Sequence, residues 1–351
     1  MKKIMYALLC VAILASCKKD GENLIDPSKY VYPIEPVKLK EDARVGAYYM
    51  QYKTADWQKP MADTASLGFY DALQAPVFDQ HLAWAAQGGV DFFIFKWDGT
   101  SGNAMLNAAK ARINAAGNAG TKIVIEYVTT HIGATNASPL SGAKLQTLIN
   151  EWKTLNTSFF SDDSYYKIDG RPVVLLGPLN LSTAARTSID YKKVADSIRY
   201  ELGQLNVNPY IIGEFTTGWV APANYPAEWL SAMDGIVLNN WATADYDRFY
   251  AFYSYSDMNY KNWQTTLAAQ NVDFVPCIFP AYNNPATATQ YVFERTDKNF
   301  TDYCNVAKRN IGNDRFVLVN SWNDFQKGNA LEPGKKYATE SLDILKRELK
   351  K

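Results

Sequence analysis

The fold is decided by the stretch Gly89-Val90-Asp91-Phe92-Phe93-Ile94-Phe95-Lys96-Trp97, which reads GVDFFIFKW over residues 89–97. Its centre is an unbroken run of aromatic and aliphatic residues, which is typical of a strand buried on both faces, as in a parallel sheet. Lys96 is unusual at the end of such a run, because a buried lysine needs a carboxylate partner. The stretch therefore predicts a buried parallel strand that ends in polar groups.

Similar runs recur along the chain. The eight expected strands are Val45–Met50, Val90–Trp97, Lys122–Tyr127, Pro172–Gly177, Tyr210–Glu214, Gly235–Asn239, Asp273–Phe279 and Phe316–Asn320. The expected helices are Pro76–Gln87, Ala104–Ala116, Ser141–Leu155, Tyr191–Leu205, Asp257–Ala269, Asp302–Asn310 and Thr339–Leu349. Alternating strands and helices, with no obvious second domain, predict a single (β/α)8 TIM barrel over residues 41–351. A doubly wound open sheet is the alternative, but residues 48–52 lack the Gly-rich turn that usually follows its first strand.

The N-terminal residues predict export. Lys2 and Lys3 lead into the apolar segment Ile4–Ala15, which is too short to span a bilayer comfortably. Leu14-Ala15-Ser16-Cys17 then resembles the bacterial lipobox. We expect a lipoprotein signal peptide over residues 1–16, lipidation of Cys17 and a polar tether over residues 17–40. The lipid would be the only membrane contact and would hold the protein in the bacterial cell envelope, at the outer membrane, on its surface or periplasmic face. An ordinary secretory signal with a chance cysteine is the alternative.

The composition narrows the classes of ligand. The formal net charge is zero, so the chain has no electrostatic reason to bind nucleic acid. Aromatic residues make up 14% of the chain, with 9 Trp and 23 Tyr, which suits stacking on sugar rings as well as an aromatic-rich core. Cys277 and Cys304 either pair or stay as buried thiols. With 2 histidines a His-rich zinc site is excluded, and neither a metal nor another cofactor is expected.

In a (β/α)8 barrel the active site lies at the C-terminal ends of the strands. The residues expected there are aromatic rings, amides and carboxylates, without a phosphate-binding glycine loop or a Ser-His-Asp arrangement. This mixture indicates a site for an oligosaccharide or polysaccharide, in which paired carboxylates supply the acid and the base or nucleophile. Glu126 and Glu214 are candidate carboxylates, although Glu126 also suits a structural ion pair with Lys96. The candidate sugar-binding residues at the strand ends are Tyr48, Tyr49, Trp97, Asp98, His131, Trp241, Tyr282, Trp322 and Asn323.

Several segments together carry a family resemblance. They are Val45–Tyr49, Gly68–Asp71, His81–Ala85, Gly89–Trp97, Tyr165–Val173 and Ser321–Pro333, of which the last is the most specific. The chain resembles family 99 of the glycoside hydrolases and the related WbsX-like proteins of polysaccharide gene clusters. The resemblance implies a (β/α)8 barrel that acts on α-mannosides, as in mannan, from inside the chain and retains the anomeric configuration. It also implies a motif Asn-Glu-Trp-x-Glu-Gly, whose first glutamate acts as a base on the substrate's 2-hydroxyl and whose second is the acid/base.

The final motif departs from the family pattern. It reads Asn323-Asp324-Phe325-Gln326-Lys327-Gly328, so Asp324 takes the place of the first glutamate and Lys327 that of the acid/base. Aspartate has a shorter reach, and lysine, with an ordinary pKa of about 10.4, is a poor acid at neutral pH.

Three hypotheses follow from this departure. The protein is a glycan binder without turnover, or its carboxylates come from other strand ends, such as Glu126, Glu214 or Asp98. Alternatively, the loop is shifted so that Glu332 serves instead. We take Asp324 as a third candidate catalytic residue, and add Lys327 and Glu332 to the residues expected to line the sugar.

Overall fold

The computed structural model describes residues 31–135, 137–179, 189–216, 221–239, 251–286 and 292–351 of the chain. The expected signal peptide, the lipidation site at Cys17, most of the expected tether and Trp241 lie outside the described residues. Predictions about these parts of the chain therefore stay predictions.

The described strands form a parallel sheet that closes into a barrel. Its order is β8-β7-β6-β5-β3-β2-β1-β12-β9. The strands are β1 (Arg44–Tyr49), β2 (Phe92–Trp97), β3 (Lys122–Val128), β5 (Arg171–Gly177), β6 (Tyr210–Phe215), β7 (Gly235–Leu238), β8 (Asp273–Val275), β9 (Cys277–Ile278) and β12 (Phe316–Val319). The two end strands, β8 and β9, are parts of one run that Pro276 interrupts, because proline has no N–H for the ladder. The predicted (β/α)8 barrel is thereby confirmed.

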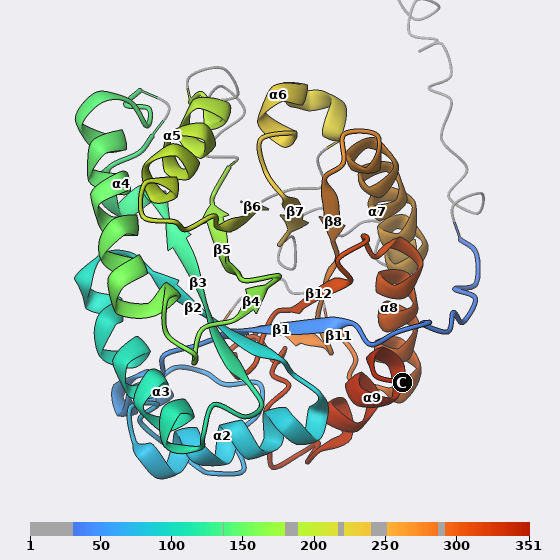
Figure 1. Ribbon diagram of the computed structural model, residues 1–351. Coiled ribbons are helices and arrows are strands. Elements are labelled where there is room, and N and C mark those ends of the chain that lie inside the picture. The colour runs from blue at the N-terminus through green and yellow to red at the C-terminus, as the bar shows by residue number, and fades with distance from the viewer. Residues whose placement is uncertain (1–30, 136, 180–188, 217–220, 240–250, 287–291) are drawn as a thin grey trace, which may run out of the picture.

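Helices surround the barrel on its outside (Figure 1). They are α2 (Ala75–Gly88), α3 (Asn103–Ala115), α4 (Gly142–Leu155), α5 (Tyr191–Gly203), α6 (Ala227–Leu230), α7 (Phe252–Ala268), α8 (Asp297–Asn310) and α9 (Glu340–Leu349). Helix α8 begins earlier than the sequence predicted, because the Thr296 side chain caps it by accepting a hydrogen bond from the Asn299 backbone N–H. The prediction also omitted α6, β4 (Lys167–Ile168) and the hairpin of β10 (Tyr282–Asn283) with β11 (Val292–Phe293).

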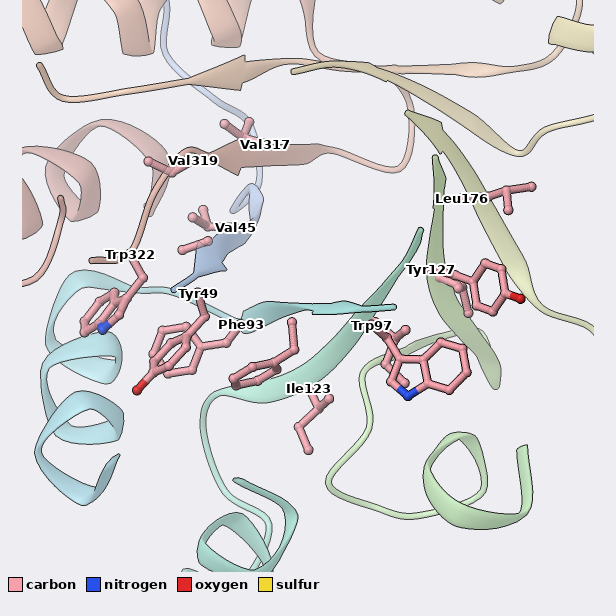
Figure 2. Packing of buried hydrophobic residues seen from close by; sticks show 14 of the residues in the cluster. Val45, Tyr49, Phe93, Trp97, Ile123, Tyr127, Leu176, Val317, Val319 and Trp322 are labelled. Carbon is pink, nitrogen blue, oxygen red and sulfur yellow. The ribbon is translucent and has the colours of Figure 1, made fainter. Parts of the chain in front are cut away.

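Side chains along each strand alternate between the interior of the barrel and the layer under the helices. Interior residues such as Tyr48, Ile94 and Val124 form one buried cluster. Their neighbours in the sequence, such as Tyr49 and Phe93, belong to the outer cluster shown in Figure 2. The two directions decide which strand-end residues can face the mouth of the barrel.

The segment 31–42 before β1 packs against the flank of the barrel, where Figure 1 shows it beside α8. The Tyr32 hydroxyl donates to Asp257 on α7 at 2.9 Å, and the Val37 backbone N–H donates to Asn305 on α8 at 3.1 Å. Part of the expected tether is therefore bound to the barrel. No described helix combines the length and the apolar character needed to cross a membrane.

The two cysteines of the barrel are free thiols. Cys277 lies in the barrel interior and Cys304 lies in α8, and both are buried. Burial raises the pKa of both thiols well above the ordinary value for cysteine. The alternative of a disulfide between them is thus not realised.

Candidate functional site

Two carboxyl groups meet at the C-terminal end of the barrel interior. Glu126 lies near the end of β3 and Glu214 near the end of β6, and each carboxyl group is close enough to shift the pKa of the other. Strand β5 lies between β3 and β6, and it carries Gly177 at this level. A Cβ on Gly177 would lie 2.8 Å from Glu214 Oε2, so the glycine leaves the space in which the pair forms.

The surroundings of the pair raise the pKa of both carboxyl groups. Burial and the charge of Glu214 raise the pKa of Glu126 well above its ordinary value. Burial also raises the pKa of Glu214, while hydrogen bonds from Tyr48, Asn239 and Glu126 favour its ionised form. Glu214 is fully buried, whereas Glu126 is partly exposed. The raised pKa values favour the protonated form of the pair, and Glu126 is the member on the side open to solvent.

A row of polar side chains connects the pair to the loop after β12. Tyr48 Oη and Asn239 Nδ2 donate to Glu214 Oε1 at 2.7 and 2.8 Å. Asn320 Nδ2 donates to Asn239 Oδ1 at 2.8 Å, and Asn329 Nδ2 donates to Asn320 Oδ1 at 3.3 Å. Tyr48, predicted to contact sugar, is here the residue that orients Glu214.

Asp324 is held within its own loop. Its Oδ2 lies 3.4 Å from Lys327 Nζ, and its Oδ1 accepts the Lys327 backbone N–H at 3.1 Å. The Asp324 side chain is 4% exposed and that of Lys327 is 31% exposed. The lysine that replaces the family's acid/base thus neutralises the neighbouring carboxylate, and it is the more accessible of the two.

Four predicted sugar-binding residues lie instead in the layer between the barrel and α2: Tyr49, Trp322, Asn323 and Glu332. Tyr49 Oη lies 2.8 Å from His81 Nδ1 on α2. Glu332 accepts the Tyr70 hydroxyl at 2.6 Å, and its other oxygen lies 3.3 Å from His81 Nε2. The hypothesis of a shifted loop that brings Glu332 to the mouth is therefore wrong, because that side chain is fully buried among these partners.

Trp97 also points away from the barrel interior. Its ring stacks on Tyr127 with the centroids 5.3 Å apart, and Figure 2 shows the two rings side by side. His131 packs edge-on against Trp97, and its Nε2 lies 3.0 Å from Glu151 on α4. These rings belong to the packing between β2, β3 and α4, so a role for Trp97 in the mouth is not supported.

Two of the remaining predicted residues, Asp98 and Tyr282, differ in how far they are exposed to solvent. Lys96 Nζ lies 3.7 Å from Asp98, and both side chains are exposed near the end of β2. The ion pair expected between Lys96 and Glu126 is thus replaced by one with Asp98, although the lysine charge still favours the ionised form of Glu126. Tyr282 is buried in the hairpin of β10 and β11.

The sequence placed Asn239 and Asn320 at strand ends without choosing them as site residues, and it missed Gly177. All three occupy the interior-facing position at the end of a strand, two residues after an interior aliphatic residue such as Val237 or Leu318. Strict alternation from the centre of each strand would have identified them. Among the described residues no group of three His, Cys, Asp or Glu is arranged to hold a metal ion.

Several solved structures share this fold. A glycoside hydrolase-like protein has a TM-score of 0.81 at 23% identity, over 93% of this chain and 99% of its own. The GH99 endo-alpha-mannosidase from Bacteroides thetaiotaomicron has a TM-score of 0.65 at 16% identity, over 88% of this chain and 99% of its own. A chitinase from Bacteroides thetaiotaomicron reaches 0.51 at 14% identity, over 88% and 97%. No curated protein that was compared matches the chain.

The closed barrel and its strand-end carboxyl groups define a (β/α)8-barrel protein with a glycoside hydrolase-like fold. Within that class, the chain belongs to the family described as glycosyltransferase WbsX, which matches residues 51–345. The match includes Glu126, Glu214 and Asp324, and it confirms the resemblance to WbsX-like proteins.

Proposed function

We propose that this protein binds an oligosaccharide or polysaccharide at the C-terminal mouth of its barrel and hydrolyses a glycosidic bond there. The observation that carries the proposal is the placement of Glu126 and Glu214 together at the end of the barrel interior, where burial raises the pKa of both carboxyl groups. A carboxylic acid that keeps its proton at neutral pH is the group that a glycosidase needs to protonate a leaving oxygen.

The chemistry assigns different tasks to the carboxyl groups. Glu126 gives its proton to the glycosidic oxygen while the bond between that oxygen and the anomeric carbon breaks. Water adds to the anomeric carbon, and the proton that it releases returns to Glu126. Glu214 raises the pKa of Glu126 and so favours the proton on Glu126 until transfer, and the Glu126 carboxylate left after transfer supplies negative charge beside the oxocarbenium-like transition state.

An α-mannoside is the substrate class that we propose. The support is the fold shared with an endo-alpha-mannosidase and the family-99-like order of the segments around the mouth. The family description names transfer instead of hydrolysis. The two reactions differ in the acceptor, since transfer gives the sugar to a hydroxyl of another molecule and hydrolysis gives it to water.

A second candidate is a surface glycan-binding protein without turnover. The ion pair of Asp324 with Lys327 favours this candidate, because it occupies the place of both family glutamates with a neutralised pair. Binding would then use the same mouth, and Glu126 would not transfer a proton.

The test uses protein that lacks residues 1–17, incubated with α-mannan and with a panel of other polysaccharides. Hydrolysis predicts released oligosaccharides, and Glu126→Gln should lower the rate roughly a hundredfold to ten-thousandfold, as loss of a general acid does. Glu201→Gln is the matched control, because Glu201 pairs with Lys153 between α5 and α4 on the flank.

Each outcome assigns a function. Products longer than the added oligosaccharide would indicate transfer. Binding without any product would identify the glycan-binding protein. If the protein neither binds nor cleaves any polysaccharide of the panel, the carbohydrate proposal is contradicted.

We further propose that the protein is a lipoprotein of the bacterial cell envelope, at the outer membrane. The support is the order of positive, apolar and small residues before Cys17. In this location the protein would contact polysaccharides outside the cytoplasm, which is consistent with the proposed substrate.

A further inference from the structure

The loop that follows β1 presents apolar side chains to solvent. Phe69 is 61% exposed, and Met50, Leu67 and Leu73 are also exposed. The loop lies on the C-terminal side of the barrel, because it leaves the end of β1 and leads into α2. The exposed side chains thus lie on the face that carries the proposed site.

Phe69 is held by buried rings beneath it. The Trp57 ring stacks under Phe69 with centroids 5.5 Å apart and an angle of 24° between the planes. Tyr52 stacks on Trp57 at 4.5 Å and 21°. The indole Nε1 of Trp57 donates to the Tyr70 carbonyl at 2.7 Å, which fixes the orientation of the stack. The ring of Phe69 is therefore the outer end of a three-ring stack whose other members are buried.

The same stack contacts the loop that carries Asp324. The Phe325 ring lies 5.8 Å from the Trp57 ring, and Phe325 follows Asp324 directly in the chain. Burial and the charge of Asp324 both raise the pKa of the Tyr52 hydroxyl. The Phe69 ring and the loop that carries Asp324 are therefore packed on the same buried ring of Trp57, on the C-terminal side of the barrel.

We propose that Phe69 is the platform of an outer sugar-binding subsite, on which one pyranose ring of a bound polysaccharide stacks. The inference rests on the proposed function and adds a subsite to it. A pyranose presents a flat face of C–H groups, which packs on an aromatic plane, and a stacked aromatic loses little conformational entropy on binding because it is already fixed. A chain long enough to pass from the mouth over the loop after β1 is the ligand that this subsite takes.

The experiment measures the dissociation constant of the protein without residues 1–17 for the polysaccharide that the wild-type protein binds best, and for a short oligosaccharide of the same sugar. Phe69→Ala should weaken binding of the polysaccharide roughly tenfold, while binding of the short ligand at the mouth stays unchanged. Phe69→Trp keeps an aromatic plane and should bind like wild type. Tyr200→Ala is the control, because Tyr200 is 67% exposed on α5. Thermal unfolding of each variant shows that the fold is kept.

Other results would overturn the subsite. Equal polysaccharide binding by wild type and Phe69→Ala contradicts it while leaving the proposed function intact. Self-association of the wild type that Phe69→Ala abolishes, without any change in polysaccharide binding, would identify the apolar loop as a contact between protein copies. A wild-type protein that binds no glycan would remove both the proposed function and the subsite.

Discussion

The proton shared by Glu126 and Glu214 links the stability of the protein to pH. In the unfolded chain each carboxyl has a pKa of about 4.3, whereas in the folded protein the pKa of both carboxyls is raised. Above the unfolded value and below the folded value, the native state holds the extra proton. The stabilisation is thus complete below the unfolded pKa and is lost as the pH rises, by up to about 1.4 kcal/mol per pH unit for one proton.

Urea unfolding of wild type and Glu126→Gln between pH 4 and pH 8 tests this prediction. The difference in free energy of unfolding, wild type minus variant, should fall as the pH rises, because the neutral amide has no proton to lose. Two curves that run parallel over the whole range would mean that the pair does not share a proton.

At the residue scale the sequence located the strand-end carboxyl groups better than their surroundings. The positions of Glu126 and Glu214 could be predicted because each follows an apolar run near the C-terminal end of a strand. Tyr49, Trp97 and Trp322 could not be separated from true mouth residues by their position near a strand end. Their side chains face the helices. Which side a strand residue faces follows from its position in the alternation along the strand, not from its distance to the strand end.

At the scale of the elements, strand β5 leaves space for the Glu214 carboxyl group because its last residue, Gly177, has no side chain. In Gly177→Ala the new Cβ would lie 2.8 Å from Glu214 Oε2 and 3.0 Å from its Cβ, so the carboxyl pair must separate. We expect a cost of about 1–3 kcal/mol in the free energy of unfolding and a loss of roughly a hundredfold in hydrolysis.

Thermal unfolding and oligosaccharide release would measure these two effects. Gly203→Ala in α5 is the control, because its Cβ would meet no atom within 4 Å. It should keep full activity and gain slightly in stability, since alanine is the better helix former. Full activity of Gly177→Ala would show that the pair does not depend on close approach across β5.

The long elements could be predicted and the short ones could not. Strands such as β3 and helices such as α4 have enough residues for an apolar run or a helical period to be recognised. The two-residue strands β10 and β11 have no period, and their antiparallel pairing joins segments that are eight residues or more apart in the chain. The interruption at Pro276 also needed the structure, because the sequence predicted one continuous strand over Asp273–Phe279.

At the scale of the whole molecule, the lipoprotein prediction can be tested without knowledge of the ligand. In a bacterium that expresses the full chain, Cys17→Ser should abolish incorporation of radiolabelled palmitate and move the protein out of the membrane fraction. Cys10→Ser is the control, because Cys10 lies within the apolar segment that cleavage removes. Palmitate incorporation that survives Cys17→Ser would refute lipidation at that residue.

The contact of segment 31–42 with α7 and α8 decides where a mechanical load enters the barrel. The segment binds the first turns of α7 through Tyr32 and the middle of α8 through Val37 before it reaches β1. A pull on the chain ahead of residue 31 is therefore resisted first by these flank contacts. Strand β1 is hydrogen-bonded between β2 and β12, and the force would reach it only after the contacts of segment 31–42 had broken. The proposed anchor ahead of residue 31 would therefore load the flank of the barrel first, while the strands that hold Glu126 and Glu214 stay in register.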